Sequence, residues 1–433
     1  MCSSDLEQVA TKLLAVLLFS ALLTAQTADP KLRAASAREA AKQGIDGIPV
    51  LITLASDASA EVRLEAARQL NTIGGPRTLP ALSVLANDAD PEVQLNAIDG
   101  LINIFVPGYL KSGVARATTR SADGIKVKFN DPGNLVVDGY VTVAPEAVAA
   151  VTQALKSSKN LAVRANAARA LGIFRAASAN RELTEALYSK DDQLMYEALI
   201  AIQKSRDVSA GPGVAFLVRD LNPKIQQAAL ETAGILRAQP AAANIRTVLD
   251  DQPALKTQRA AVAALAMIAD PADRGIFLRF LISKDADLRA AAGEGLARIK
   301  NPADKDRLTQ AFNDEREYNA RLSMAFGLVS LGNLEINDLS PFRYLLNSLN
   351  RAAFRGVTLA FLTELARESA VRLTLYPSLD RATKDEKVGL CRVLGESGQQ
   401  DSAPYLSKLK DDKDPEVAQN CLSSLRTLEA RLK

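Results

Sequence analysis

The sequence predicts an all-α fold, an α-solenoid of about twelve helical hairpins with one insertion that contains a β-hairpin. First, similar helical segments recur about every 31 residues. Second, hydrophobic residues make up 48% of the chain, yet aromatic residues make up only 5% and Trp is absent. Third, 433 residues are many for one compact core. An array of repeats avoids that limit because each repeat buries surface only against its neighbours.

The first 28 residues are expected to form a secretory signal peptide. Lys12 precedes an apolar run from Leu13 to Leu23, and small or polar residues follow up to Ala28. This run is too short for an ordinary membrane-spanning helix. A buried helix of the first repeat is the alternative. Residues 1–6, MCSSDL, resemble the translation of a sequencing adapter, so we expect the natural N-terminus to be missing.

The recurring segment reads as a capped helix, as in DPEVQLNAIDGLINIF from Asp90 to Phe105. An apolar anchor lies three residues after each apparent cap, with Thr257 as the exception. Two weaker copies lie near Phe354 and Lys387. The remaining anchors are Leu32, Val62, Val93, Val163, Leu194, Ile225, Thr257, Leu288, Tyr318 and Val417.

The positions around the anchors have consistent chemistry. Most copies have a residue that can cap the free N–H groups of a helix, and Pro often follows it at the first helical position. Most copies also have Ala four residues after the anchor and an apolar residue eight after it, which places all three on one helix face. The caps are Asp29, Ser59, Asp90, Asn160, Asp191, Asn222, Asp285 and Asp414; the alanines are Ala66, Ala97, Ala167, Ala198, Ala229, Ala261 and Ala292.

A shorter apolar stretch precedes each capped helix, as in IPVLITLA from Ile48 and LPALSVLA from Leu79. The connections are so short that the two helices of a repeat must be antiparallel neighbours. We therefore expect repeats over residues 29–105 and 145–433, with an insertion at 106–144 between them.

These units resemble HEAT repeats, most closely the HEAT-like repeats of phycobilisome lyases. The resemblance is carried by EVRLEAARQL from Glu61, AVRANAARALG from Ala162 and DLRAAAGEGL from Asp287. It covers nearly all of the chain from Asp29 onward except the insertion. The copies near Tyr318, Phe354 and Lys387 depart from the pattern. The resemblance implies a solenoid, a fold that serves many functions.

The insertion at 106–144 differs sharply in composition and is rich in Gly, Ser, Thr and Val. IKVKF alternates apolar and basic residues as a half-exposed strand does, NDPGN is a turn signal, and LVVDGYVTV is expected to return as a second strand. The insertion is a candidate docking element for a protein or an acidic polymer. A hairpin packed on the solenoid without a ligand is the alternative. Its candidate binding residues are Arg116, Arg120, Lys126, Lys128, Phe129 and Tyr140.

A second candidate surface is a row of arginines one residue after their anchors: Arg33, Arg63, Arg164 and Arg289. The row could bind acidic groups of a partner, and Arg63, Arg164 and Arg289 are its main candidates. The favoured alternative is that these arginines pair with carboxylates of neighbouring repeats and hold the stack together.

Composition argues against several chemistries. The chain has no His, the commonest general base and metal ligand, and no phosphate-binding Gly-rich loop stands out. With 53 basic and 50 acidic residues, it lacks the basic excess of most nucleic-acid binders. No catalytic, cofactor-binding or metal-binding residues are predicted. Cys391 and Cys421 either pair in an exported protein or are small core residues, and the second alternative is favoured.

We therefore expect a non-catalytic scaffold that binds protein partners over an extended solenoid surface. It is expected to be exported to the periplasm or cell envelope, without a transmembrane span in the mature chain and without nucleic acid as a partner. One alternative is an enzyme or accessory subunit of the phycobilin-lyase or nucleic-acid-processing HEAT type, as the resemblance implies. The other is an envelope-anchored structural component.

Overall fold

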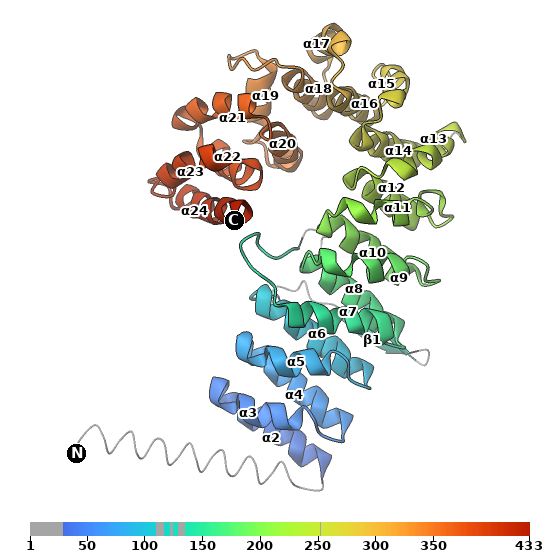
Figure 1. Cartoon of the computed structure of the whole chain (residues 1–433), viewed down its shortest axis with the longest axis vertical. Helices are drawn as coiled ribbons and strands as arrows, with labels where there is room; N and C mark the ends of the chain where they lie inside the picture. Colours follow the sequence, from blue (N-terminus) through green and yellow to red (C-terminus); the bar gives the residue numbers. More distant parts are fainter. Residues whose placement is uncertain (1–28, 110–116, 122–123, 129–134, 252) are drawn as a thin grey trace, which may run out of the picture. The chain divides into compact units, whose positions relative to one another are not determined.

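The computed structural model describes residues 29–109, 117–121, 124–128, 135–251 and 253–433 (Figure 1). The chain divides into two compact units. Unit 1 comprises Met1–Val137 and Val141–Ala210, and unit 2 comprises Asp138–Tyr140 and Gly211–Lys433. In both units a first helix, usually the shorter one, is followed by a second helix, and successive second helices pack against one another.

In unit 1 the second helices are α2, α4, α6, α8 and α10, and the first helices are α3, α5, α7 and α9. Their bounds are α2 Pro30–Lys42, α3 Ile48–Leu54, α4 Ala60–Ile73, α5 Leu79–Leu85, α6 Pro91–Phe105, α7 Pro145–Ser157, α8 Leu161–Ile173, α9 Asn180–Ala186 and α10 Asp192–Ser205.

In unit 2 the second helices carry even numbers from α12 to α24, and the first helices carry odd numbers. Their bounds are α11 Gly211–Val214, α12 Pro223–Ile235, α13 Ala242–Asp250, α14 Leu255–Ile268, α15 Arg274–Phe280, α16 Ala286–Ile299, α17 Lys305–Asp314, α18 Tyr318–Ser330, α19 Pro341–Ser348, α20 Ala352–Leu365, α21 Ser369–Leu375, α22 Lys384–Ser397, α23 Ala403–Leu409 and α24 Pro415–Leu432. The second helices of the described residues thus number twelve, as the repeat count predicts.

Short 3-10 turns precede many of the first helices, and two others, η5 and η9, follow the first helices α11 and α21. They are η1 Gly44–Gly47, η2 Pro76–Thr78, η3 Ala177–Ala179, η4 Val208–Ala210, η5 Leu217–Arg219, η6 Gln239–Ala241, η7 Pro271–Asp273, η8 Pro302–Asp304, η9 Tyr376–Arg381 and η10 Gln400–Ser402.

The second helices form the core because their apolar face is flanked by neighbours. In α4, Val62, Ala66 and Leu70 are fully buried, and the equivalent positions of α6, α8, α12 and α16 are buried or nearly so. Small residues let the backbones approach closely. A Cβ added to Gly172 of α8 would lie 2.8 Å from the Cα of Ala201 in α10. The α-solenoid architecture follows from this repeated burial.

Seven of the eight predicted caps act as such. The side chains of Asp29, Asp90, Asn160, Asp191, Asn222, Asp285 and Asp414 accept backbone N–H groups of the first turn. Ser59 is the exception, because its side chain makes no capping hydrogen bond. Its backbone N–H instead donates to Asp57 Oδ1 at 2.8 Å.

The expected strand pairing of the insertion is wrong. IKVK does form a strand, β2 (Gly124–Lys128), but its antiparallel partner is the preceding segment β1 (Ala117–Ser121). Residues 135–143, expected to return as a strand, have irregular backbone with a turn at 139–140 and form no strand. The NDPGN turn lies outside the described residues.

The copies that depart from the pattern are shifted in register. The N-cap of α18 is Glu317, so its anchor position is the buried Ala320 and not Tyr318. The N-cap of α22 is Thr383, so the anchor position of the copy expected near Lys387 is the adjacent Glu386. Glu386 is buried and accepts hydrogen bonds from Arg343 at 3.0 Å and Asn350 at 2.9 Å, which compensates its charge.

An aromatic cluster replaces aliphatic packing at these divergent repeats. The rings of Tyr318 and Phe354 lie 4.3 Å apart between centroids, and Tyr344 stands 5.1 Å from Tyr318. Arg321 lies over the rings of Phe312 at 4.6 Å and Tyr344 at 5.1 Å, a cation–π arrangement. Burial raises the pKa of Tyr344 to about 12. The cluster therefore joins α17, α18, α19 and α20.

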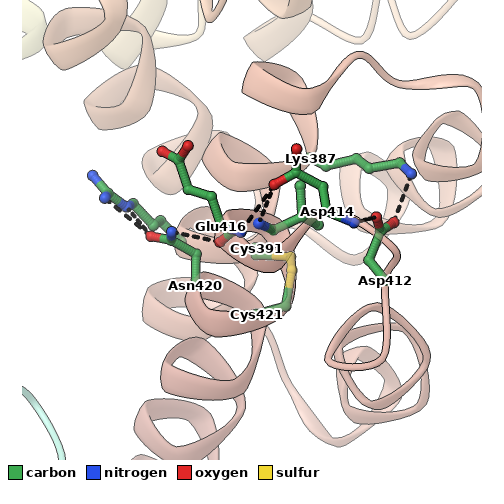
Figure 2. The surroundings of a disulfide bond; sticks show 9 residues. Lys387, Cys391, Asp412, Asp414, Glu416, Asn420 and Cys421 are labelled. Atoms are coloured by element: carbon green, nitrogen blue, oxygen red, sulfur yellow. Dashed lines mark hydrogen bonds and ion pairs between the residues drawn. A yellow bond between two sulfur atoms is a disulfide. The ribbon is translucent and has the colours of Figure 1, made fainter.

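A disulfide joins the last two second helices. Cys391 of α22 and Cys421 of α24 are both fully buried and bonded, with their Cα atoms 5.0 Å apart (Figure 2). Beside the disulfide, Lys387 Nζ contacts Asp412 Oδ2 at 2.7 Å, and Asp412 accepts the backbone N–H of Asp414 at 3.0 Å. The terminal repeat is thus fixed both covalently and ionically to the one before it.

Candidate partner-binding surfaces

The insertion residues are only partly described. Arg116 and Phe129 lie outside the described residues. In the β1–β2 ladder, Arg120 is opposite Ile125, Lys126 is opposite Thr119 and Lys128 is opposite Ala117.

Tyr140 is the insertion residue whose surroundings are clearest. It is 39% exposed, and its hydroxyl donates to Asp138 Oδ2 at 3.0 Å. This hydrogen bond raises the pKa of Tyr140. The ring therefore offers exposed aromatic surface together with a hydroxyl held by a carboxylate.

The arginine row is engaged within the protein. Arg63 of α4 meets Asp88 of the next repeat through two contacts of 2.6 and 2.8 Å, and Arg33 meets Asp57 in the same way at 2.6 and 2.9 Å. Arg289 pairs with Glu315 of the next repeat at 2.7 and 2.9 Å. These bidentate pairs link successive repeats.

Arg164 behaves differently from the rest of the row. Its Nε donates to the carbonyl of Leu155, in the same repeat, at 2.8 Å. Arg63 and Arg289 therefore bridge repeats, whereas Arg164 joins a first helix to the second helix of the same repeat.

The paired carboxylates also organise helix starts. Asp57 and Asp88 each accept the backbone N–H of the residue two places on, at 2.8 and 2.7 Å. The hydrogen bond from Arg33 holds the pKa of Asp57 below its usual range, and the bond to Asp88 raises the pKa of Arg63. Each such carboxylate thus joins a neighbouring arginine to the turn before the next second helix.

A second set of ion pairs lies at the 3-10 turns, and the sequence analysis did not predict it. Arg246 of α13 contacts Asp273 of η7, and Arg274 of α15 contacts Asp304 of η8, with Nε distances of 2.6 and 2.9 Å. Both aspartates are fully buried. The repeated DPAD from Asp270 and NPAD from Asn301 was the available signal.

A groove lies between the repeats of α15 and α17 in unit 2. Its cavity measures about 620 Å³, within the range of ligand-binding clefts. Its apolar wall is made by Leu278, Leu281 and Ile282 at the end of α15, by Ala311 of α17 and by Met324 of α18. The side chain of Ile282 is 85% exposed. Exposure of apolar surface to water is unfavourable, so burying this side chain against a ligand would be favourable.

The rim of the groove carries both charges. Arg307, Asp314, Arg316 and Glu317 line it, and none of them has an ion pair among the described residues. The sequence offered one signal for the groove. Six residues before the anchor, earlier repeats have the polar Ser56, Asn87 and Ser157, where this one has Ile282.

A network of charges joins the second helices of unit 2 across several repeats. Arg298 of α16 contacts Glu364 of α20 at 3.0 Å and Glu294 of its own helix at 2.9 Å. Arg237, after α12, contacts the same Glu364 at 2.9 Å although 127 positions separate them in sequence. Arg298 is 8% exposed and lies over the ring of Phe326 at 5.1 Å.

A smaller cavity of about 190 Å³ adjoins this network. We call it the cationic pocket. Four cations line it, Arg237, Arg298, Lys300 and Arg367, against the two carboxylates of Glu364 and Glu368. Both carboxylates are engaged, because Glu364 pairs with two arginines and Lys300 contacts Glu368 at 3.2 Å.

Comparison with known proteins identifies the repeat. The family model described as HEAT repeats matches residues 17–102, and pairs of helices continue beyond that match to Leu432. The matched part of the chain is therefore similar to HEAT repeats. Curated proteins give no match.

Several solved structures resemble this chain at low identity. An engineered protein is 18% identical with a TM-score of 0.38, covering 95% of this chain and 98% of that one. The complex of CpcE and CpcF of phycocyanin lyase from Nostoc sp. PCC7120 is 19% identical with a TM-score of 0.36, covering 62% and 92%. Importin beta is 13% identical with a TM-score of 0.46, covering 98% and 66%. At these TM-scores the similarities carry no functional argument.

The part of the chain that the structure describes shows neither a membrane span nor a cluster of metal ligands. No helix there has both the length and the apolar composition needed to span a membrane. Within the same residues, no group of three or more His, Cys, Asp or Glu side chains is placed to hold a metal ion.

Proposed function

We propose that this protein is a non-catalytic scaffold that binds segments of partner proteins. The groove between α15 and α17 carries the proposal. Its apolar wall fits a bulky aliphatic or aromatic anchor, and its rim of both charges suits the flanking residues of a peptide. Burying Ile282 against such an anchor would contribute about 1.5–3 kcal/mol, or roughly tenfold to a hundredfold in affinity.

A displayed library of random peptides tests this function. The chain should enrich peptides with a large apolar residue flanked by charged ones. The variant Ile282→Asp should lose that enrichment, whereas Val84→Asp, which alters an exposed apolar residue of α5, should keep it. If Ile282→Asp enriches the same peptides as the unaltered chain, the groove is not the binding site.

The insertion is the second contact surface that we propose. Its basic and aromatic residues, Arg116, Arg120, Lys126, Lys128, Phe129 and Tyr140, would add contacts to a partner bound at the repeats. Replacing residues 107–143 by a short Gly-Ser turn tests this role. A protein partner that the unaltered chain captures should bind the shortened chain more weakly, while the melting of the helices stays unchanged. Equal binding by both chains would contradict the role.

We also propose that the protein is exported. The apolar run from Leu13 to Leu23 supports this, as does the disulfide between Cys391 and Cys421, because disulfides persist in oxidising compartments. N-terminal sequencing of the protein from its native cell should find a start near Gln26 or Asp29. An intact leader on protein recovered from the cytoplasm would contradict export.

A further inference from the structure

We propose that the cationic pocket binds an acidic segment of a partner protein, whose carboxylates compete with Glu364 for Arg237. The pocket shares no lining residue with the groove between α15 and α17. The inference therefore adds a second site, with a ligand of different chemistry, to the proposed scaffold.

Charge is the first argument for an anionic ligand. The pocket's four cations outnumber its two carboxylates, and they still outnumber them when Glu294, which contacts Arg298, is counted. Arg367 is exposed, and its guanidinium has no ion pair among the described residues. The pocket thus presents a cation that no carboxylate of the described chain neutralises.

The neighbouring arginines extend this positive region. Arg431 of α24 donates to the carbonyl of Gly398 and, within the described chain, meets no carboxylate. Burial lowers the pKa of Arg431, and the charges of Arg367 and Arg372 lower it further. Arg372 has one carboxylate partner, Asp401, at 3.3 Å. Positive charge here is incompletely compensated, and an acidic ligand would relieve the repulsion.

The pocket's dimensions and present contacts favour a peptide carboxylate over a nucleic-acid phosphate. The guanidinium groups of Arg237 and Arg298 already hold a carboxylate in hydrogen-bonding geometry. The volume of about 190 Å³ is below the usual range of small-molecule clefts but can admit a side chain. Phe326, Val329, Leu365 and Val371 line the same pocket and can contact the methylene groups of a glutamate.

Exchange at Glu364 is feasible because its contact with Arg237 is open to water. The side chains of Arg237 and Glu364 are 50% and 26% exposed. Ion pairs with this degree of exposure contribute little to stability, so a ligand carboxylate can replace Glu364 at Arg237 without a large penalty.

Fluorescence anisotropy with a labelled octaglutamate peptide tests the site on the full chain. Octaglutamine, of equal length and no charge, should not bind. Arg367→Gln should weaken octaglutamate binding roughly tenfold. Glu364→Gln removes the internal competitor and should tighten binding roughly threefold. Lys256→Gln, at an exposed lysine outside the pocket, should leave the affinity unchanged.

The outcomes separate this site from its rivals. Circular dichroism first establishes that each variant keeps its helical signal. If Arg367→Gln binds octaglutamate as the unaltered chain does, or if Glu364→Gln binds it more weakly, the proposal is overturned. Equal affinity for octathymidylate would overturn the choice of a protein segment. Ile282→Asp should leave octaglutamate binding intact, so failure at the groove and failure here are distinguishable.

Discussion

Replacing Arg63 by Met should weaken the junction between the repeats of α4 and α6. The guanidinium of Arg63 makes two contacts with Asp88, at 2.6 and 2.8 Å, and its Nη1 donates to the carbonyls of Asp57 and Ala58 at 2.9 and 3.1 Å. The side chains of Arg63 and Asp88 are only 15% and 8% exposed, so this pair is poorly screened by solvent.

The expected cost follows from these contacts. Breaking a fully buried ion pair costs about 3–5 kcal/mol, and breaking an exposed one costs less than about 1 kcal/mol. Asp88 keeps one partner in the variant, the backbone N–H of Asp90 at 2.7 Å. We therefore expect Arg63→Met to lower the free energy of unfolding by about 2–3 kcal/mol, with Met preserving the contacts of the aliphatic stem.

A double-mutant cycle with Asp88→Asn isolates the pair. Urea unfolding followed by circular dichroism should give a coupling energy of about 1–2 kcal/mol between the two positions. The matched control is Arg68→Met on the same helix. The side chain of Arg68 is 52% exposed, and its ion pair with Glu65 is long, at 3.9 Å. Its replacement should therefore cost less than about 0.5 kcal/mol. A cost at Arg63 no larger than at Arg68, or zero coupling, would refute the structural role of the row.

Three further predictions concern the disulfide, acid and one helix end. Replacing Cys391 and Cys421 by Ala should destabilise the last repeat by roughly 3–4 kcal/mol, because the bond closes a loop of 30 residues; thermal unfolding measures it. Hydrogen bonds from arginines lower the pKa values of Asp57 and Asp285 in the folded chain. The stability that these ion pairs contribute should be fully present above about pH 4 and should be lost as the pH falls through the lowered folded pKa values. Urea unfolding at several pH values between about 5 and 2 checks this. Arg206→Gly should stabilise the chain by about 0.5–1 kcal/mol in urea unfolding, because Arg206 ends α10 with φ of 53°.

A different result would contradict each of these three predictions. Unchanged thermal unfolding of the double Ala variant would show that the disulfide adds no stability. Replacing Asp57 and Asp285 by Asn should flatten the acid loss, and an equally steep loss would assign it to other groups. Arg206→Ala keeps the Cβ and should not stabilise, so an equal gain from Ala and Gly would contradict the conformational explanation.

The second helices could be predicted from the sequence because their signals are local. Val62, Ala66 and Leu70 recur with helical spacing, and their burial depends only on the next helix being a copy. The caps are equally local, since Asp90 satisfies backbone N–H groups two and three residues away. The anchor at Tyr318 was misplaced because the anchor position of that helix holds the small Ala320, and the copy near Lys387 was weak because its anchor position holds the charged Glu386.

The candidate sites depend on contacts between distant residues, which no local pattern encodes. The cationic pocket requires Arg237 to meet Glu364, which is 127 positions away. The strand pairing of the insertion failed for a related reason. The alternation in IKVK marks a strand but does not specify whether its partner precedes or follows it.

Hydrogen exchange on the Arg63→Met chain tests most directly whether each helical pair is stabilised by its immediate neighbours, as a solenoid requires. Backbone amides of α4 and α6 should exchange faster than in the unaltered chain, while those of α10, in the same unit, should keep their rates. If the amides of α10 accelerate by the same factor, unit 1 opens as one cooperative core, and stabilisation by nearest neighbours is contradicted.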